Sequence, residues 1–143
     1  MKIPGLFDLQ VNGYKSVDFC SAELTEDAFV YASRELIKNG TSLFLPTVIT
    51  SSPEVYQRNL KLMVKAIVKA GLEEHIPGFH LEGPFISPED GARGAHAKEW
   101  VSKPDTGLLD QMILWSENKI KLLTVAAEIP GMEMLCRLSL IHI

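Results

Sequence analysis

Short apolar runs alternate along the chain with longer segments of helical periodicity. The apolar runs cover residues 6–12, 42–48, 77–82 and 120–126. Between and after them, apolar side chains recur every three or four positions, which is the spacing of one helix face. The helical segments cover residues 26–38, 53–70 and 108–117. This alternation predicts an α/β protein.

Residues that start and stop helices support these boundaries. Thr25 is a predicted N-cap of the first helix, and Asn39-Gly40 supplies its end. Ser52 precedes Pro53 at the first position of the second helix, and Gly71 ends that helix. The predicted buried faces are Phe29, Ala32, Leu36 and Ile37 on the first helix, and Tyr56, Leu60, Met63, Val64, Ile67 and Val68 on the second.

Strands separated by helices form right-handed βαβ units and a parallel sheet. Two architectures fit four such units. One is a complete doubly wound domain, and the other is the first half of an eight-unit (β/α)₈ barrel, which normally needs at least ~200 residues. The length of 143 residues favours the doubly wound domain.

Composition narrows the class of protein. With 46% hydrophobic residues, 22% charged residues and a net charge of -4, the chain has the composition of a globular domain. The charges are spread without blocks, which argues against a nucleic-acid or membrane partner and leaves a small-molecule substrate. No apolar run suggests a membrane span or a signal peptide, so we expect a cytoplasmic protein. Cys20 and Cys136 form no CxxC pair and indicate neither a disulfide framework nor a structural zinc site.

Polar residues gather where strands are predicted to end. In an extended first strand, Asp8, Gln10 and Asn12 share the face opposite Phe7, Leu9 and Val11. His80 and Glu82 share a face at the carboxyl end of the third strand, where parallel α/β folds bind their ligands. Glu128, at the end of the fourth run, is a weaker candidate for the same edge.

The two residues of the third strand call for different interpretations. His80 alone is best explained as a hydrogen-bonded structural residue. A buried Glu82 carboxylate needs a compensating partner, and a metal ion, a lysine or a group of amides would each serve.

A long connection, residues 83–106, follows the third strand. It contains the segment Gly91-Ala92-Arg93-Gly94-Ala95-His96, whose small residues would let a substrate approach the backbone. Arg93 and His96 are candidate partners for an anionic group. A flexible surface loop is the alternative interpretation.

Four segments together resemble one known family. They are Pro4–Gly13 (PGLFDLQVNG), Leu45-Pro46-Thr47, residues 80–86 (HLEGPFI) and Gly94-Ala95-His96. In order and spacing they resemble the N-acetylglucosamine-6-phosphate deacetylase family of the amidohydrolase superfamily, over about residues 4–135. No P-loop, GxGxxG, GxSxG or HExxH motif competes with this interpretation.

The resemblance implies a metal-dependent (β/α)₈ barrel that removes the acetyl group from N-acetylglucosamine 6-phosphate. It therefore overrides the length argument and implies that residues 1–135 are the N-terminal half of the barrel, about four βα units. It places the family's glutamate metal ligand on Glu82 and its substrate-binding pair on Ala95 and His96. Gln10 and Asn12 stand where most amidohydrolases have metal-binding histidines, which implies one divalent ion, Zn²⁺ or Fe²⁺, whose water contacts Gln10 or Asn12.

The remaining family ligands do not match positions in this chain. The resemblance places two histidine ligands and the catalytic aspartate beyond its end, so no catalytic residue is assigned here. We expect the fragment alone to be inactive, because hydrolytic zinc sites generally use three protein ligands. Residues 136–143 depart from the family pattern and form a tail foreign to it, for which an artefact of the sequence is one explanation.

Two other functions stay open. One is a non-catalytic sugar-phosphate binding module that keeps Ala95 and His96. The other is an amidohydrolase that acts on a cyclic amide, although the Gly94-Ala95-His96 segment suits a sugar phosphate better. The sequence also leaves open whether the whole enzyme is a homodimer.

Overall fold

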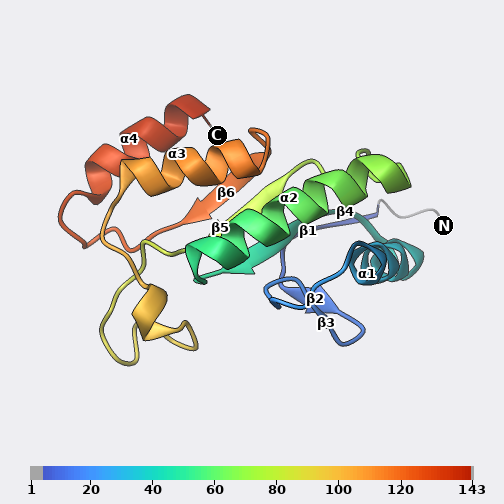
Figure 1. The fold of residues 1–143 in the computed structure, drawn as a ribbon, viewed down its shortest axis with the longest axis horizontal. Coiled ribbons are helices and arrows are strands. Elements are labelled where there is room, and N and C mark those ends of the chain that lie inside the picture. The colour runs from blue at the N-terminus through green and yellow to red at the C-terminus, as the bar shows by residue number, and fades with distance from the viewer. Residues whose placement is uncertain (1–4, 143) are drawn as a thin grey trace.

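The computed structural model describes residues 5–142, with α/β architecture as the sequence predicts (Figure 1). Pro4, in the first family-like segment, lies outside the described residues. The elements in chain order are β1 (Leu6–Val11), β2 (Gly13–Tyr14), β3 (Val17–Asp18), α1 (Glu26–Lys38), β4 (Thr41–Ile49), α2 (Pro53–Ala70), β5 (Phe79–Glu82), a 3₁₀ turn η1 (Lys98–Trp100), α3 (Thr106–Trp115), β6 (Ile120–Thr124) and α4 (Met132–His142).

The main sheet contains four parallel strands in the order β1-β4-β5-β6. Spatial order thus follows chain order. A doubly wound sheet reverses its strand order at a switch point, and this sheet does not. The doubly wound alternative, which the chain length favoured, is therefore wrong. The register places Glu82 beside Ile49 on one side and beside Thr124 on the other.

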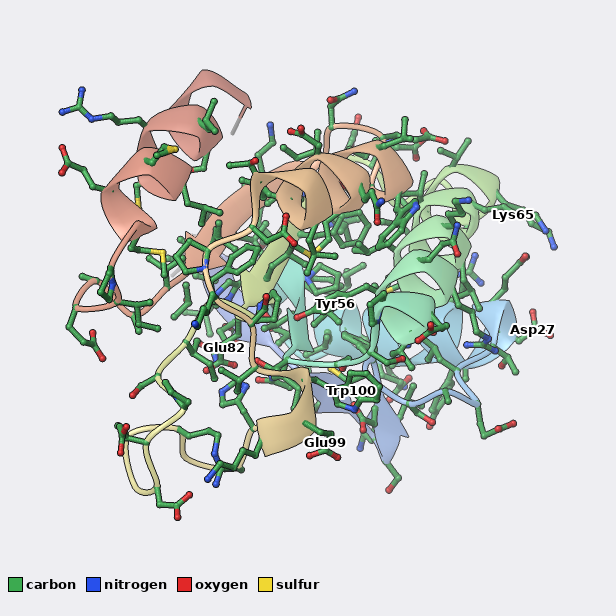
Figure 2. All side chains as sticks on the ribbon, turned by 60° about the vertical axis from the view of Figure 1, so that its left-hand side comes forward. Asp27, Tyr56, Lys65, Glu82, Glu99 and Trp100 are labelled. Carbon is green, nitrogen blue, oxygen red and sulfur yellow. The ribbon has the colours of Figure 1, made fainter. Side chains whose placement is uncertain are left out.

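The helices follow the strand order and cover one face of the sheet. α1 packs against α2, α2 against α3, and α3 against α4, so neighbouring helices in the chain are neighbours in space (Figure 1). The core lies between these helices and the sheet. Tyr56 of α2 points into this core, whereas Asp27 and Lys65 project outward (Figure 2).

Local sequence explains the ends of α1 and α2. Thr25 Oγ1 accepts a hydrogen bond from the Ala28 N–H at 3.2 Å, so the predicted N-cap is confirmed. Ser52 caps α2 in the same way, and Gly71 ends it in the left-handed conformation with φ 66°. The predicted buried face of α2 is confirmed except at Val68, which is 56% exposed. Val68 lies at the border of the stripe, where the helix turns toward solvent.

The outer strand β1 exposes most of its apolar side chains. Leu6, Phe7 and Leu9 are 69%, 52% and 53% exposed, and only Val11 is buried. β1 pairs with β4 alone, so its other edge has no strand partner within residues 5–142.

Two elements differ from the sequence-based description. The β2–β3 hairpin was not predicted, because its turn residues Lys15 and Ser16 adopt positive φ values of 51° and 64° without the usual Asn-Gly signature. α4 continues through residue 136, where the divergent tail was predicted to begin. That boundary stays a prediction. No helix within the described range is both long and apolar enough to cross a membrane.

Candidate active site

A cleft of about 1280 Å³ opens at the carboxyl ends of the strands. The β2–β3 hairpin and the long connection after β5 project on the same side of the molecule (Figure 1). Residues of both segments line the cleft. Figure 2 shows Glu82 on the side from which the segment carrying Glu99 and Trp100 protrudes. Residues from β5 and from segments far apart in the chain thus meet around one cavity.

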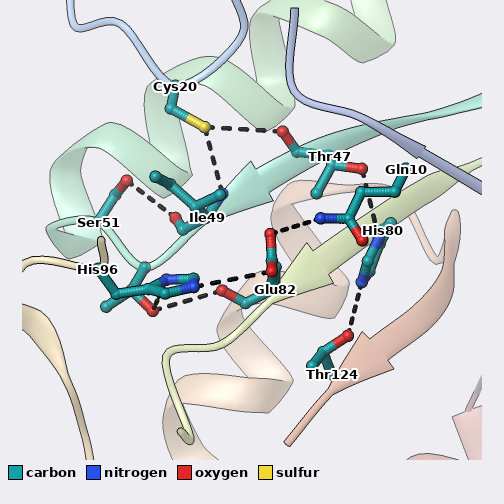
Figure 3. Close-up of polar contacts among 10 residues, drawn as sticks. Gln10, Cys20, Thr47, Ile49, Ser51, His80, Glu82, His96 and Thr124 are labelled. Atoms are coloured by element: carbon teal, nitrogen blue, oxygen red, sulfur yellow. Dashed lines mark hydrogen bonds and ion pairs between the residues drawn. The ribbon is translucent and has the colours of Figure 1, made fainter. Parts of the chain in front are cut away.

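Glu82, the last residue of β5, lines this cleft and is held by Gln10 of β1. Gln10 Nε2 donates a hydrogen bond to Glu82 Oε2 at 2.9 Å (Figure 3). The Glu82 side chain is 23% exposed, so its carboxylate is shielded but open to the cavity. The family resemblance implied that Gln10 or Asn12 contacts the water of a metal ion. In the structure Gln10 contacts the expected ligand itself.

His96 faces the other oxygen of the same carboxylate. Its Nε2 lies 3.7 Å from Glu82 Oε1, and its side chain is 15% exposed. Nδ1 of His96 lies 3.0 Å from Oγ1 of Thr50, which also donates to the main-chain oxygen of Glu82 at 3.3 Å. Thr50 follows β4 directly, so three elements converge on one glutamate.

His80 takes the structural role expected of it. Its side chain is buried between Thr47 and Thr124, with Nδ1 3.3 Å from Thr47 Oγ1 and Nε2 2.8 Å from Thr124 Oγ1. Burial lowers the pKa of His80, although the nearby Glu82 charge opposes that shift. A neutral imidazole with both nitrogens hydrogen-bonded ties β4, β5 and β6 together beneath the cleft.

The other predicted site residues all line the cavity, but they differ in exposure and in their hydrogen bonds. Asn12 and Ala95 line it and are exposed. Glu128 also lines it, although β6 ends at Thr124 rather than at Glu128. Arg93 lines the cavity too, but its guanidinium donates to the His96 carbonyl at 2.6 Å and to Asp90 at 2.8 Å. Arg93 therefore braces its own loop, whereas its buried Nε has no hydrogen-bond partner among the described residues. Its contact with an anionic group stays a prediction.

Sequence reasoning missed Thr50 and Cys20. Thr50 looks like an ordinary residue after a strand, and only the fold brings it to His96. Cys20 Sγ lies 3.6 Å from the Thr47 carbonyl and accepts from the Ile49 N–H at 3.2 Å. Burial raises the pKa of the Cys20 thiol to about 12. Both cysteines are free.

The residues present offer part of a metal site. Among the described residues, no three His, Cys, Asp or Glu side chains lie close enough together to share an ion. Glu82 has the form of one such ligand, since an amide holds one carboxylate oxygen while the other faces the cavity. The donor set thus fits one ligand of a divalent cation.

Comparison with known proteins gives this geometry a family context. No family model matches the chain. A protein named N-acetylglucosamine-6-phosphate deacetylase from Caenorhabditis elegans is 33% identical over 135 residues, which is 90% of this chain and 32% of that protein. The human protein of the same name is 34% identical over 133 residues, covering 88% of this chain and 31% of its own length. The chain is related to the N-acetylglucosamine-6-phosphate deacetylases.

Solved structures of these deacetylases are also similar to this chain. The crystal structure from Mycobacterium smegmatis matches 90% of this chain and 32% of its own, with a TM-score of 0.77 and 26% identity. The structure of a mutant of that enzyme in complex with N-acetyl-D-glucosamine-6-phosphate matches equally well, at 28% identity. The Thermotoga maritima deacetylase covers 95% of this chain and 34% of its own at a TM-score of 0.75. The chain thus spans about a third of the length of the deacetylases it matches.

Proposed function

We propose that this chain forms the Glu82 side of the active site of an enzyme that converts N-acetylglucosamine 6-phosphate to glucosamine 6-phosphate and acetate. The observation that carries the proposal is the Glu82 carboxylate at the end of β5, held by Gln10 and facing His96 across the cleft. The chain's relationship to deacetylases supports the reaction, and the complex of the Mycobacterium smegmatis mutant supports the substrate.

Glu82 is the proposed ligand of one divalent ion, Zn²⁺ or Fe²⁺. Such an ion, when bound, lowers the pKa of a coordinated water and polarises the acetamide carbonyl. Gln10 orients the carboxylate that would hold it. Asn12, which lines the cleft next to the hairpin, is the proposed contact of the water, and Ala95 and His96 are the proposed contacts of the sugar.

The sheet supports a partial (β/α)₈ barrel of about four units. Consecutive parallel strands with helices on one face curve in one direction, which is how a barrel wall is built. The second face of the sheet carries His80 and Glu82, as a barrel interior would carry its site residues at the carboxyl end.

The site needs residues that this chain does not supply. One carboxylate is too few for a hydrolytic metal site, which generally uses three protein ligands. Coverage of about a third of each relative is consistent with a longer enzyme that contributes two histidine ligands and the catalytic aspartate. A cytoplasmic location and a homodimeric assembly remain predictions.

The test is to sequence the coding region around these residues, express the complete reading frame with Zn²⁺ or Fe²⁺, and measure acetate release from N-acetylglucosamine 6-phosphate. We expect deacetylation in the intact sequence and at least a ~100-fold loss in Glu82→Gln, because the amide is a poor ligand. Glu99→Gln, on the exposed 3₁₀ turn, is the matched control and should leave the rate unchanged. Unchanged activity in Glu82→Gln would refute the proposal.

Calorimetry on the 143-residue chain distinguishes the proposed deacetylase fragment from a non-catalytic sugar-phosphate binding module. The proposal predicts no saturable binding of glucosamine 6-phosphate to the chain alone. Saturable binding that Ala95→Trp abolishes would instead favour the binding module.

A further inference from the structure

The Thr50 hydroxyl joins two groups of the site, and it has only one hydrogen to give. Thr50 is 3% exposed, so its bonding is confined to its protein neighbours. Its Oγ1 lies 3.3 Å from the main-chain oxygen of Glu82 and 3.0 Å from Nδ1 of His96. A carbonyl oxygen can only accept, so the hydroxyl donates to Glu82. Thr50 can then only accept from His96, and Nδ1 must carry a hydrogen.

This assignment fixes the chemistry of the other imidazole nitrogen. A neutral imidazole carries one N–H, so with Nδ1 protonated the Nε2 of His96 is an acceptor. That nitrogen points toward the cleft, 3.7 Å from the acceptor Oε1 of Glu82. Two acceptors that face the same space favour a ligand that brings a hydrogen-bond donor or positive charge. They disfavour a phosphate oxygen.

A second threonine–histidine pair beneath the site has the same arrangement. Thr47 Oγ1 donates to the Leu45 carbonyl at 3.2 Å and lies 3.3 Å from Nδ1 of His80. Nε2 of His80 is then the acceptor for the Thr124 hydroxyl at 2.8 Å. In both pairs a backbone carbonyl takes the threonine hydrogen and thereby sets the form of the histidine. His80 uses its acceptor inside the protein, whereas His96 directs its acceptor to the cavity.

We propose that Thr50 is a positioning residue that holds His96 in the Nδ1–H form, so that Nε2 faces the cleft as a hydrogen-bond acceptor. The group it receives is one that brings a hydrogen-bond donor to the space beside Glu82. The identity of the molecule that carries this group rests on the proposed function, whereas the form of the imidazole does not.

The test is long-range ¹H–¹⁵N correlation spectroscopy on the ¹⁵N-histidine-labelled 143-residue chain near pH 7.5, without metal or sugar. His96→Gln identifies the His96 signals. We expect His96 Nε2 to show the chemical shift of an unprotonated nitrogen and Nδ1 that of a protonated one. Thr50→Val should move the Nε2 shift toward the protonated range, and Thr50→Ser should keep the wild-type pattern. Thr47→Val, the matched control, should change His80 and leave His96 unaltered.

Three results would overturn the proposal. They are protonation of His96 Nε2 in the wild-type chain, a wild-type pattern in Thr50→Val, and an equal effect of Thr47→Val on His96. An unfolded variant does not obscure the answer, because the wild-type pattern decides by itself. Absence of deacetylase activity from the complete reading frame would refute the proposed function and leave this measurement standing.

Discussion

Gln10 Nε2 donates a hydrogen bond to Glu82 Oε2 across 2.9 Å, although the two residues are on the first and third strands of the sheet by sequence. β4 lies between those strands. The bond therefore spans two strand spacings across one face of the sheet. In the proposed metal site this bond would position the carboxylate before the ion binds and so reduce the ordering cost of binding.

Replacing Gln10 with leucine should weaken divalent metal binding by the complete enzyme. Loss of a hydrogen bond that orients a metal ligand typically costs ~10–100-fold in affinity. Competition titration with a chromophoric chelator measures the change. Gln57→Leu on the exposed surface of α2 is the control and should bind metal like the wild type. Equal affinities for the Gln10 variant and this control would contradict the assigned role of Gln10.

Gly83 and Gly91 allow backbone strain to be separated from a steric effect. Their φ values are 92° and 91°, so an alanine is similarly strained at either position. A Cβ at Gly83 would collide with the Thr50 hydroxyl, whereas one at Gly91 would meet nothing within 4 Å. We expect Gly91→Ala to lower the free energy of unfolding by ~1 kcal/mol, and Gly83→Ala to lower it by ~1–3 kcal/mol more.

Urea unfolding of the 143-residue chain measures this difference. If the two variants were equally stable, the close approach of Gly83 to Thr50 would be irrelevant to folding.

The Cys20 thiol should make stability depend on alkaline pH. The unfolded thiol loses its proton near 9.0, whereas the folded thiol keeps it to about 12. The folded state therefore binds more protons between these values, and the free energy of unfolding falls as pH rises through this window. Burial also raises the pKa of Tyr56 above its ordinary value of 10.0, so the cleanest interval is pH 9–10.

Denaturant titrations of wild type and Cys20→Ala across that interval are the measurement. In Cys20→Ala, the free energy of unfolding should depend much less steeply on pH than in the wild type. As a second measurement, iodoacetamide at pH 8 should modify Cys20 roughly 100-fold more slowly in the folded chain than in urea, because the thiolate is the reactive form. A rate unaffected by urea would contradict the raised pKa.

The β1 edge should cause the isolated chain to self-associate. Phe7 and Leu9 are half exposed on an edge strand that offers unpaired backbone groups. Replacing both with lysine should reduce the fraction of oligomer in sedimentation velocity experiments. Tyr31→Lys is a matched control, since Tyr31 is 52% exposed on α1, away from the edge. An unchanged oligomer fraction in the double lysine variant would exclude this edge as the cause.

Local signals predicted most of the fold because the helices start and stop at residues with clear backbone preferences, such as Thr25 and Gly71. Strand order was not accessible in the same way. Chain length favoured a doubly wound sheet, and only the family resemblance indicated a barrel. The hairpin escaped prediction because Lys15 and Ser16 adopt positive φ values that neither residue type signals.

The site was predictable where one strand supplied the pattern and unpredictable where partners came from separate elements. Alternation along β5 placed His80 and Glu82 on one face, as the structure has them. The contacts of Gln10 with Glu82 and of Thr50 with His96 depend on strand register and on the path of a long loop. Arg93 shows a similar limit, because its residue type suggested an anion contact but not the hydrogen bonds that it donates within its own loop.

Glu82 is anchored twice, at its side chain by Gln10 and at its main chain by Thr50. Substitutions on β1 and just after β4 therefore act on the same glutamate, and their energetic effects should not add. Such epistasis restricts evolutionary drift, because a change at either anchor alters which replacements the other can accept. These two distant stretches of sequence are thus expected to diverge together.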